Sequence, residues 1–153
     1  KAAEQAHRVK DALVLAVDED TTAFNAYMDA RRLPQGSPEE KAVREAAMLE
    51  GLKIAVNVPF QTAKLSFEAM QAAAAVIEHG NPASITDGMV GVQMGFAGVR
   101  GGIWNVLINL KDISDAAYNA QMKTACETLL AEARALMDRA LAEGDARLSA
   151  MLK

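Results

Sequence analysis

Apolar residues recur every three or four positions along most of the chain, which is the period of an α-helix. Over residues 4–33 this stripe consists of Leu13, Val17, Phe24 and Tyr27. Pro34 follows, and a proline ends a helix because it cannot donate a backbone hydrogen bond. The pattern therefore predicts one long amphipathic helix before Pro34.

A second and longer apolar face follows Ser37-Pro38-Glu39-Glu40, a helix-start signature with a capping box and proline at the first helical position. It extends as far as Gly80 through Leu49, Leu52, Val56, Phe60, Ala63, Phe67, Met70, Ala74 and Ile77. Unbroken, this helix would span about 60 Å, which exceeds a compact domain of this size. Pro59 lies midway, so we expect a kink or break there.

Glycines mark the third helical segment, residues 85–109, at alternating spacings of three and four. They are Gly88, Gly91, Gly95, Gly98 and Gly102. A glycine stripe on one helix face predicts that another helix, a subunit or a ligand approaches closely. Residues 88–110 carry a single charge, Arg100, together with glycines and amides, and we interpret them as a buried core helix, not a membrane span.

A fourth helix is expected after a connector at residues 111–114, capped by Asp112 or Ser114 and ended or interrupted by Gly144. Its stripe is Tyr118, Met122, Ala125, Leu129, Ala133, Leu136 and Ala140. No strand pattern appears. The sequence predicts an all-α fold over residues 1–153, an antiparallel bundle of long helices, kinked at Pro59, that dimerises.

Composition narrows the function. The net charge is −4 without a basic stripe, so no nucleic-acid partner is expected. One cysteine, Cys126, allows no disulfide within the chain and fits a reducing, cytoplasmic location. One cysteine and two histidines predict no structural metal site. Phosphate-loop and dinucleotide motifs are absent too, because no strand precedes the glycines.

Asp20 is the strongest candidate for chemistry. It falls in the apolar stripe of the first helix, between Val17 and Phe24, whereas Asp18 lies off that stripe. A carboxyl group on a buried face needs a partner, and burial favours its protonated form, which suits proton transfer near neutral pH. The alternative is a structural aspartate satisfied by an arginine or by backbone groups.

Four further polar residues are candidates for ligand binding. Asn105 and Asn109 share a helix face and could grip a heterocycle edge or hydrogen-bond a neighbouring helix. Asp87 sits in a first helical turn, where a carboxylate also favours the helix dipole. Arg100 fits a buried ion pair or a clamp for a ligand carboxylate equally well.

Three stretches carry a family resemblance: residues 17–24 (VDEDTTAF), 33–40 (LPQGSPEE), and 80–113, which include Asn81, Pro82, Ser84 and Asp87 and end in NVLINLKDI. In order and spacing they resemble the cyclodeaminase domain of formimidoyltransferase-cyclodeaminase and its relatives, which include methenyltetrahydrofolate cyclohydrolases. The resemblance implies a dimerising helical domain with folate between helices, and Asp20 as the catalytic aspartate. It implies no cofactor beyond the tetrahydrofolate substrate.

The implied reaction converts 5-formimidoyltetrahydrofolate to 5,10-methenyltetrahydrofolate and releases ammonia, a step of histidine degradation. Two alternatives stay open: a methenyltetrahydrofolate cyclohydrolase and a non-catalytic helical dimerisation module. The substrate could carry a polyglutamate tail, attracted by Arg31, Arg32, Lys41, Arg44 and Lys53, unless these cations are simply solvated. A fused or separate formimidoyltransferase domain is an implied partner.

In one respect the chain departs from the family, whose domains begin with a helix and a glycine-rich segment that is expected to line the folate site. Nothing similar stands in residues 1–153.

Overall fold

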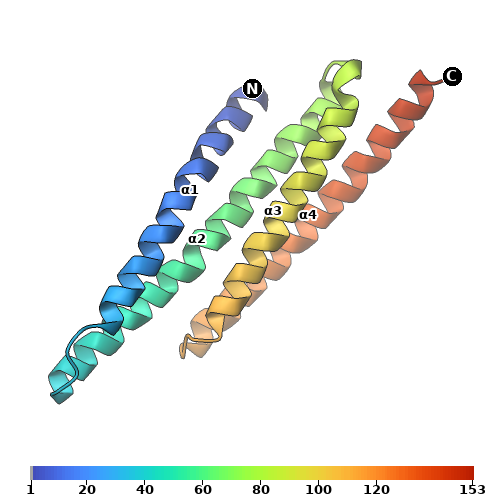
Figure 1. The fold of residues 1–153 in the computed structure, drawn as a ribbon. Helices are drawn as coiled ribbons and strands as arrows, with labels where there is room; N and C mark the ends of the chain where they lie inside the picture. Colours follow the sequence, from blue (N-terminus) through green and yellow to red (C-terminus); the bar gives the residue numbers. More distant parts are fainter. Residues whose placement is uncertain (1) are drawn as a thin grey trace.

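The computed structural model describes residues 2–153, which form a bundle of long antiparallel helices (Figure 1). The elements are α1 (Ala2–Arg31), α2 (Pro38–His79), the short 3-10 helix η1 (Pro82–Ser84), α3 (Ile85–Leu110) and α4 (Ala116–Met151). No strand occurs in this part of the chain, so the predicted all-α fold is confirmed. None of the described helices is both long and apolar enough to cross a membrane.

The helix starts are set by side-chain caps. At α2 the predicted capping box is present: Glu40 N–H donates to Ser37 Oγ, and Ser37 N–H donates to Glu40 Oε2. The cap predicted for α4, Asp112 or Ser114, is wrong. The N-cap is Asp115, whose Oδ1 accepts a hydrogen bond from Tyr118 N–H at 3.0 Å.

The main core lies between α2, α3 and α4. It contains the predicted apolar faces of α2 and α4, with Val56, Met70, Met122 and Leu136 among its buried residues. Cys126 belongs to this core, and burial raises the pKa of its thiol, as expected for a packing residue. The end predicted at Gly144 is wrong: α4 continues to Met151, and Gly144 is buried where Met89 leaves no room for a side chain.

The glycine stripe of α3 packs on α2, so the close neighbour predicted from it is a helix of the same chain. A Cβ at Gly88 would lie 2.8 Å from Ile77 Cγ1, and one at Gly102 would lie 2.6 Å from the Pro59 carbonyl oxygen. Glycine therefore lets the two backbones meet at distances that no side chain permits.

Of the kink or break expected at Pro59, the break does not occur: α2 stays helical over 42 residues. Pro59 has no N–H to donate to the carbonyl oxygen of Ala55, four residues earlier. Asn109 of α3 fills this gap: its Nδ2 donates to Ala55 O at 2.8 Å. A side chain from a neighbouring helix thus satisfies the carbonyl that the proline leaves without a partner.

Helix α1 stands apart from this core. Among the described helices it contacts only α2, along which it lies at the edge of the bundle (Figure 1). Its buried residues are Val9, Ala16, Ala23 and Ala30, one every seven positions. The apolar stripe predicted for α1 is not the buried one: Val17 is 67% exposed and Phe24 61% exposed. A helix packed on a single neighbour buries only a narrow strip, here built of small residues.

Candidate functional site

A groove of about 460 Å³ runs between α1 and α3, with α2 as its floor. It exists because both helices pack on α2 without touching each other. The polar lining comes from all three helices: Asp20 and Thr21 of α1, Thr62 of α2 and Asn105 of α3. The apolar lining is mainly Leu13, Val17, Val58 and Pro59.

Asp20 faces this groove and is exposed, so the buried position that the sequence predicted for it is wrong. Leu13, Val17 and Asp20 do share one face of α1, as the apolar stripe predicted. This face borders the groove and is not packed against another helix. Among the described residues Asp20 forms no ion pair, which leaves its carboxylate able to engage a ligand.

Two groove residues present polar atoms opposite Asp20. Asn105 uses Nδ2 to donate to Gly101 O at 3.1 Å, so its Oδ1 is left as an acceptor. Thr62 Oγ1 donates to Val58 O at 3.2 Å within α2 and retains acceptor capacity. The groove therefore combines one carboxylate with amide and hydroxyl groups beside an apolar wall, a lining suited to a flat heterocycle with polar edges.

Asp87 lies in the continuation of the groove towards the other end of the bundle. This second section has a volume of about 540 Å³ and an almost wholly apolar lining that includes Val9, Leu13 and Val76. Leu13 lines both sections, which makes them neighbours along the same α1–α3 gap. Asp87 thus lines the same gap as Asp20 but a different section of it.

Arg100 and Asn109 do not line the groove. The Arg100 guanidinium lies over the Trp104 ring of its own helix, 4.6 Å from the centroid, so its contact is not the buried ion pair considered from the sequence. Its role as a clamp for a ligand carboxylate stays a prediction. Asn109 makes the hydrogen bond to Ala55 O described above, which is the interhelical alternative of the sequence prediction.

Sequence patterns missed the threonines and one glycine of the site. Thr21 and Thr62 look like ordinary helix residues, and only the packing of α1 beside α3 brings them to one groove. Gly101 lies outside the regular glycine stripe, and a Cβ placed there would meet no atom within 4 Å. Its departure from the stripe was the available signal that it faces a different environment from Gly102.

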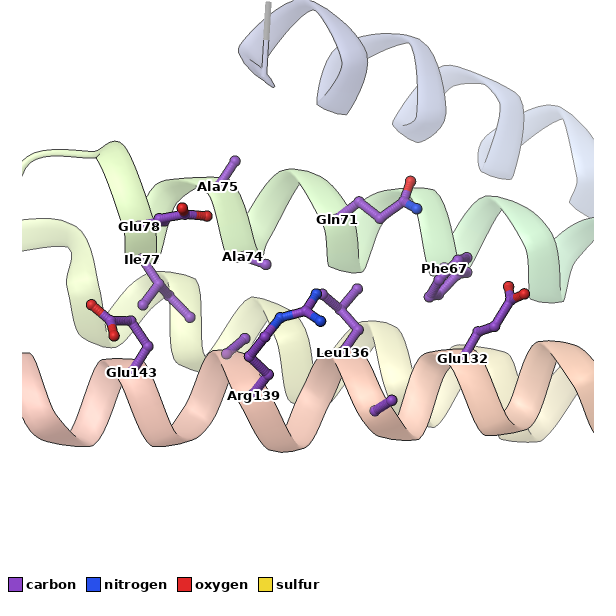
Figure 2. Close-up of a pocket in the computed structure, with 12 residues that line it drawn as sticks. Phe67, Gln71, Ala74, Ala75, Ile77, Glu78, Glu132, Leu136, Arg139 and Glu143 are labelled. Atoms are coloured by element: carbon purple, nitrogen blue, oxygen red, sulfur yellow. The ribbon is translucent and has the colours of Figure 1, made fainter.

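A larger hollow of about 690 Å³ lies between α2 and α4 (Figure 2). Its lining includes the charged residues Glu78, Glu132, Arg139 and Glu143, together with small residues such as Ala74. None of the residues selected from the sequence for chemistry lines it. Nor do the described residues contain any group of three His, Cys, Asp or Glu side chains placed to hold a metal ion.

Of the cations considered for a polyglutamate tail, three have partners elsewhere. Arg44 Nε donates to Arg31 O at 3.1 Å. Lys53 Nζ lies 3.2 Å from Asp115 Oδ2 and 5.0 Å from the centre of the Tyr118 ring. Arg32 pairs with Asp29 at 2.8 Å on the surface. No Arg or Lys lines the section of the groove that contains Asp20.

The structure thus defines an all-α helical domain with a carboxylate-bearing groove beside its core. The family model described as formiminotransferase-cyclodeaminase matches residues 1–128, and the chain belongs to this family. The resemblance stated from the sequence is therefore confirmed.

Individual relatives agree. The chain is 41% identical to formimidoyltransferase-cyclodeaminase of Gallus gallus over 84% of its length and 24% of that protein. It is 37% identical to methenyltetrahydrofolate cyclohydrolase of Methylorubrum extorquens, over 89% of its length and 65% of that protein. The chain thus spans about a quarter of the length of the animal relative.

The fold is shared with a solved structure, formiminotetrahydrofolate cyclodeaminase of Thermotoga maritima. The TM-score is 0.65 at 23% identity, and the match covers 98% of this chain and 67% of that chain. At this identity the likeness bears on the fold, an all-α helical domain.

Proposed function

We propose that this chain carries the site of a formimidoyltetrahydrofolate cyclodeaminase, an ammonia-lyase of one-carbon metabolism and histidine degradation. The observation that supports this most is the position of Asp20: an unpaired carboxylate in a groove that also presents Asn105 and Thr62. Family membership supplies the substrate class, and the groove supplies a place for a pterin ring.

The reaction is a ring closure within one substrate molecule. N10 attacks the carbon of the protonated formimidoyl group on N5 and loses its proton, and the same carbon then releases its amino nitrogen as ammonia, leaving the methenyl bridge. One proton must therefore move from N10 to the departing nitrogen. In the proposal the Asp20 carboxylate takes this proton and returns it. The groove walls contribute by holding N10 against the carbon in an attack geometry.

The α1–α3 groove suits this substrate better than the larger hollow between α2 and α4. Three glutamates surround Arg139 in that hollow, and their charge opposes the glutamate tail of folate. The groove at Asp20 contains one carboxylate and no further charged residue. A polyglutamate tail would have to extend beyond it.

The test is an assay of the protein with 5-formimidoyltetrahydrofolate, in which methenyltetrahydrofolate absorbance and ammonia release are followed together. Both signals should rise. Asp20→Asn should lower kcat by about 10²- to 10⁴-fold, the usual contribution of a general acid-base group. Asp18→Asn is the matched control, because Asp18 is exposed on α1 but lies outside this groove. Full activity in a folded Asp20→Asn variant would remove Asp20 from the mechanism.

A second candidate is methenyltetrahydrofolate cyclohydrolase, favoured by the bacterial relative of that name, of which this chain spans 65%. There water adds to the methenyl carbon, and the bond to N5 opens to give 10-formyltetrahydrofolate. The same groove could serve, with Asp20 accepting a proton from the water. Decay of added methenyltetrahydrofolate above the blank, without activity on the formimidoyl compound, would identify this reaction. A non-catalytic module agrees less well with the structure, because it predicts a buried and paired Asp20.

We also propose a homodimer, located in the cytoplasm and supplied by a fused or separate formimidoyltransferase domain. Large exposed apolar side chains support the dimer: Val14 and Phe24 on α1, and Met94, Trp104 and Ile108 on α3. Where such side chains lie together they mark protein–protein contact sites. Sedimentation should give twice the monomer mass, and Met94→Glu should shift it towards the monomer. A monomer at every concentration would refute the proposal.

A further inference from the structure

The floor of the Asp20 groove contains an interior turn of α2 in which a proline removes a backbone donor. Pro59 lies inside α2 and is buried. Because proline has no N–H, the Ala55 carbonyl loses its intrahelical partner at this turn. Such a gap ordinarily admits water or bends the helix.

Asn109 closes this gap from α3. Its Nδ2 donates to Ala55 O at 2.8 Å, a bond between residues 54 positions apart in the sequence. A second contact lies nearby: Gly102 meets the Pro59 carbonyl, from which a Cβ at this glycine would lie only 2.6 Å. Helix α3 therefore holds the turn through one hydrogen bond and one close backbone approach.

The turn of α2 at Pro59 forms part of the candidate site. Val58, Pro59 and Thr62 form the α2 part of the groove opposite Asp20. Asn105, one helical turn before Asn109, lines the groove as well. The side chain that repairs the proline gap is thus anchored on the same stretch of α3 that forms the groove wall.

We infer that Asn109 is a positioning residue: it supplies the donor that Pro59 lacks and so fixes the groove floor relative to Asp20. The catalytic part of this inference rests on the proposed function. The coupling between Asn109 and Pro59 does not, because it is measurable without substrate.

The experiment is a double-mutant cycle between Asn109→Leu and Pro59→Ala. Leucine resembles asparagine in shape but donates no hydrogen bond. Alanine at position 59 restores a backbone N–H to Ala55 O and removes the need for Asn109. In the unsubstituted background Asn109→Leu should lower Tm by about 3–10 °C and speed amide exchange across residues 55–62. In the Pro59→Ala background, Asn109→Leu should lower Tm by less than half of that amount.

Asn25→Leu, on the exposed side of α1, controls for the polarity change and should show no coupling to Pro59→Ala. An equal loss of Tm for Asn109→Leu in both backgrounds would show that Asn109 does not replace the missing donor. That result overturns the inference whether or not the protein turns over folate.

The activity arm separates positioning from stability alone. With the substrate that the protein turns over, and well below Tm, Asn109→Leu should lower kcat about tenfold, and adding Pro59→Ala should return it to within about threefold. Unchanged kcat and KM in Asn109→Leu, despite coupling in Tm, would overturn the positioning role. If the unsubstituted protein converts neither folate, the proposed function fails, and Tm and exchange still decide whether Asn109 holds the groove floor.

Discussion

The two faces of α3 meet opposite environments. One face lays Gly88, Gly95 and Gly102 directly on α2, at distances that exclude a side chain. The other leaves Met94 and Trp104 exposed, and between these faces Gly101 borders the groove. Gly101 and Gly102 are neighbours in the sequence, yet one meets open space and the other meets backbone. One helix thus belongs both to the tightest packing of the molecule and to its candidate site.

The contrast extends to the two helices that flank the groove. Helix α3 contributes buried residues such as Val99 and Val106 to the main core, whereas α1 contributes none to that cluster and buries mostly alanine on α2. Asp20 therefore lies on the wall that packs on α2 alone, whereas Asn105 lies on the wall that belongs to the main core. The groove therefore lies between one wall that is part of the main core and one wall that contacts α2 alone.

The contrast between the two faces of α3 is tested most directly by replacing Gly101 and Gly102, one at a time, with alanine. Gly102→Ala places a Cβ 2.6 Å from Pro59 O and 3.0 Å from Ala63 N, both backbone atoms that cannot turn aside. We expect a loss of about 1–3 kcal/mol in unfolding free energy. Gly101→Ala meets nothing within 4 Å and should gain up to about 1 kcal/mol from helix propensity. Urea unfolding measures both, and equal effects would contradict the packing described for α3.

Filling the open side should affect ligand binding and not stability. Gly101→Leu projects a side chain from the groove lining, where a Cβ has free space, and should raise KM about 10- to 100-fold with Tm unchanged or higher. Ala97→Leu, on the exposed face of α3 one turn earlier and outside the groove lining, is the control. Normal KM in Gly101→Leu would place the substrate elsewhere, with the α2–α4 hollow the next place to examine.

Much of this fold could be predicted from the sequence because its signals are local. Ser37 and Glu40 form the capping box, and the spacing of apolar residues identifies the buried faces of α2 and α4. The local sequence around Pro59 did not indicate a continuous α2, because the donor that the Ala55 carbonyl finds there is Asn109, 50 residues after the proline. The helix end predicted at Gly144 was wrong for the same reason, because the contact that explains this glycine comes from Met89, a residue far from it in the sequence.

The candidate site was predicted in part. Asp20 and Asn105 do face one groove, but the reasoning from burial was wrong, because periodicity identifies a face and not what covers it. Helix α1 packs on one neighbour alone, so its apolar stripe borders a groove. The sequence gives no measure of how many helices surround a given one, which is why Asp20 was expected to be buried.

The smallest expected effect lies at the start of α4, on the opposite side of the core from the groove. The Tyr118 N–H and then Lys53 hold the pKa of Asp115 below its ordinary value of 3.8. The folded state thus favours the carboxylate, so its stabilisation is complete above about pH 4 and is lost as pH falls through the lowered pKa.

Asp115→Asn should lower Tm slightly at pH 7 and reduce the further loss of Tm on acidification. The exposed Asp112 has no such role as a cap, so Asp112→Asn should leave the acid profile unchanged. Since α4 does not line the Asp20 groove, neither variant should alter KM at pH 7. A raised KM in Asp115→Asn would show that the core and the groove are coupled more tightly than their packing indicates.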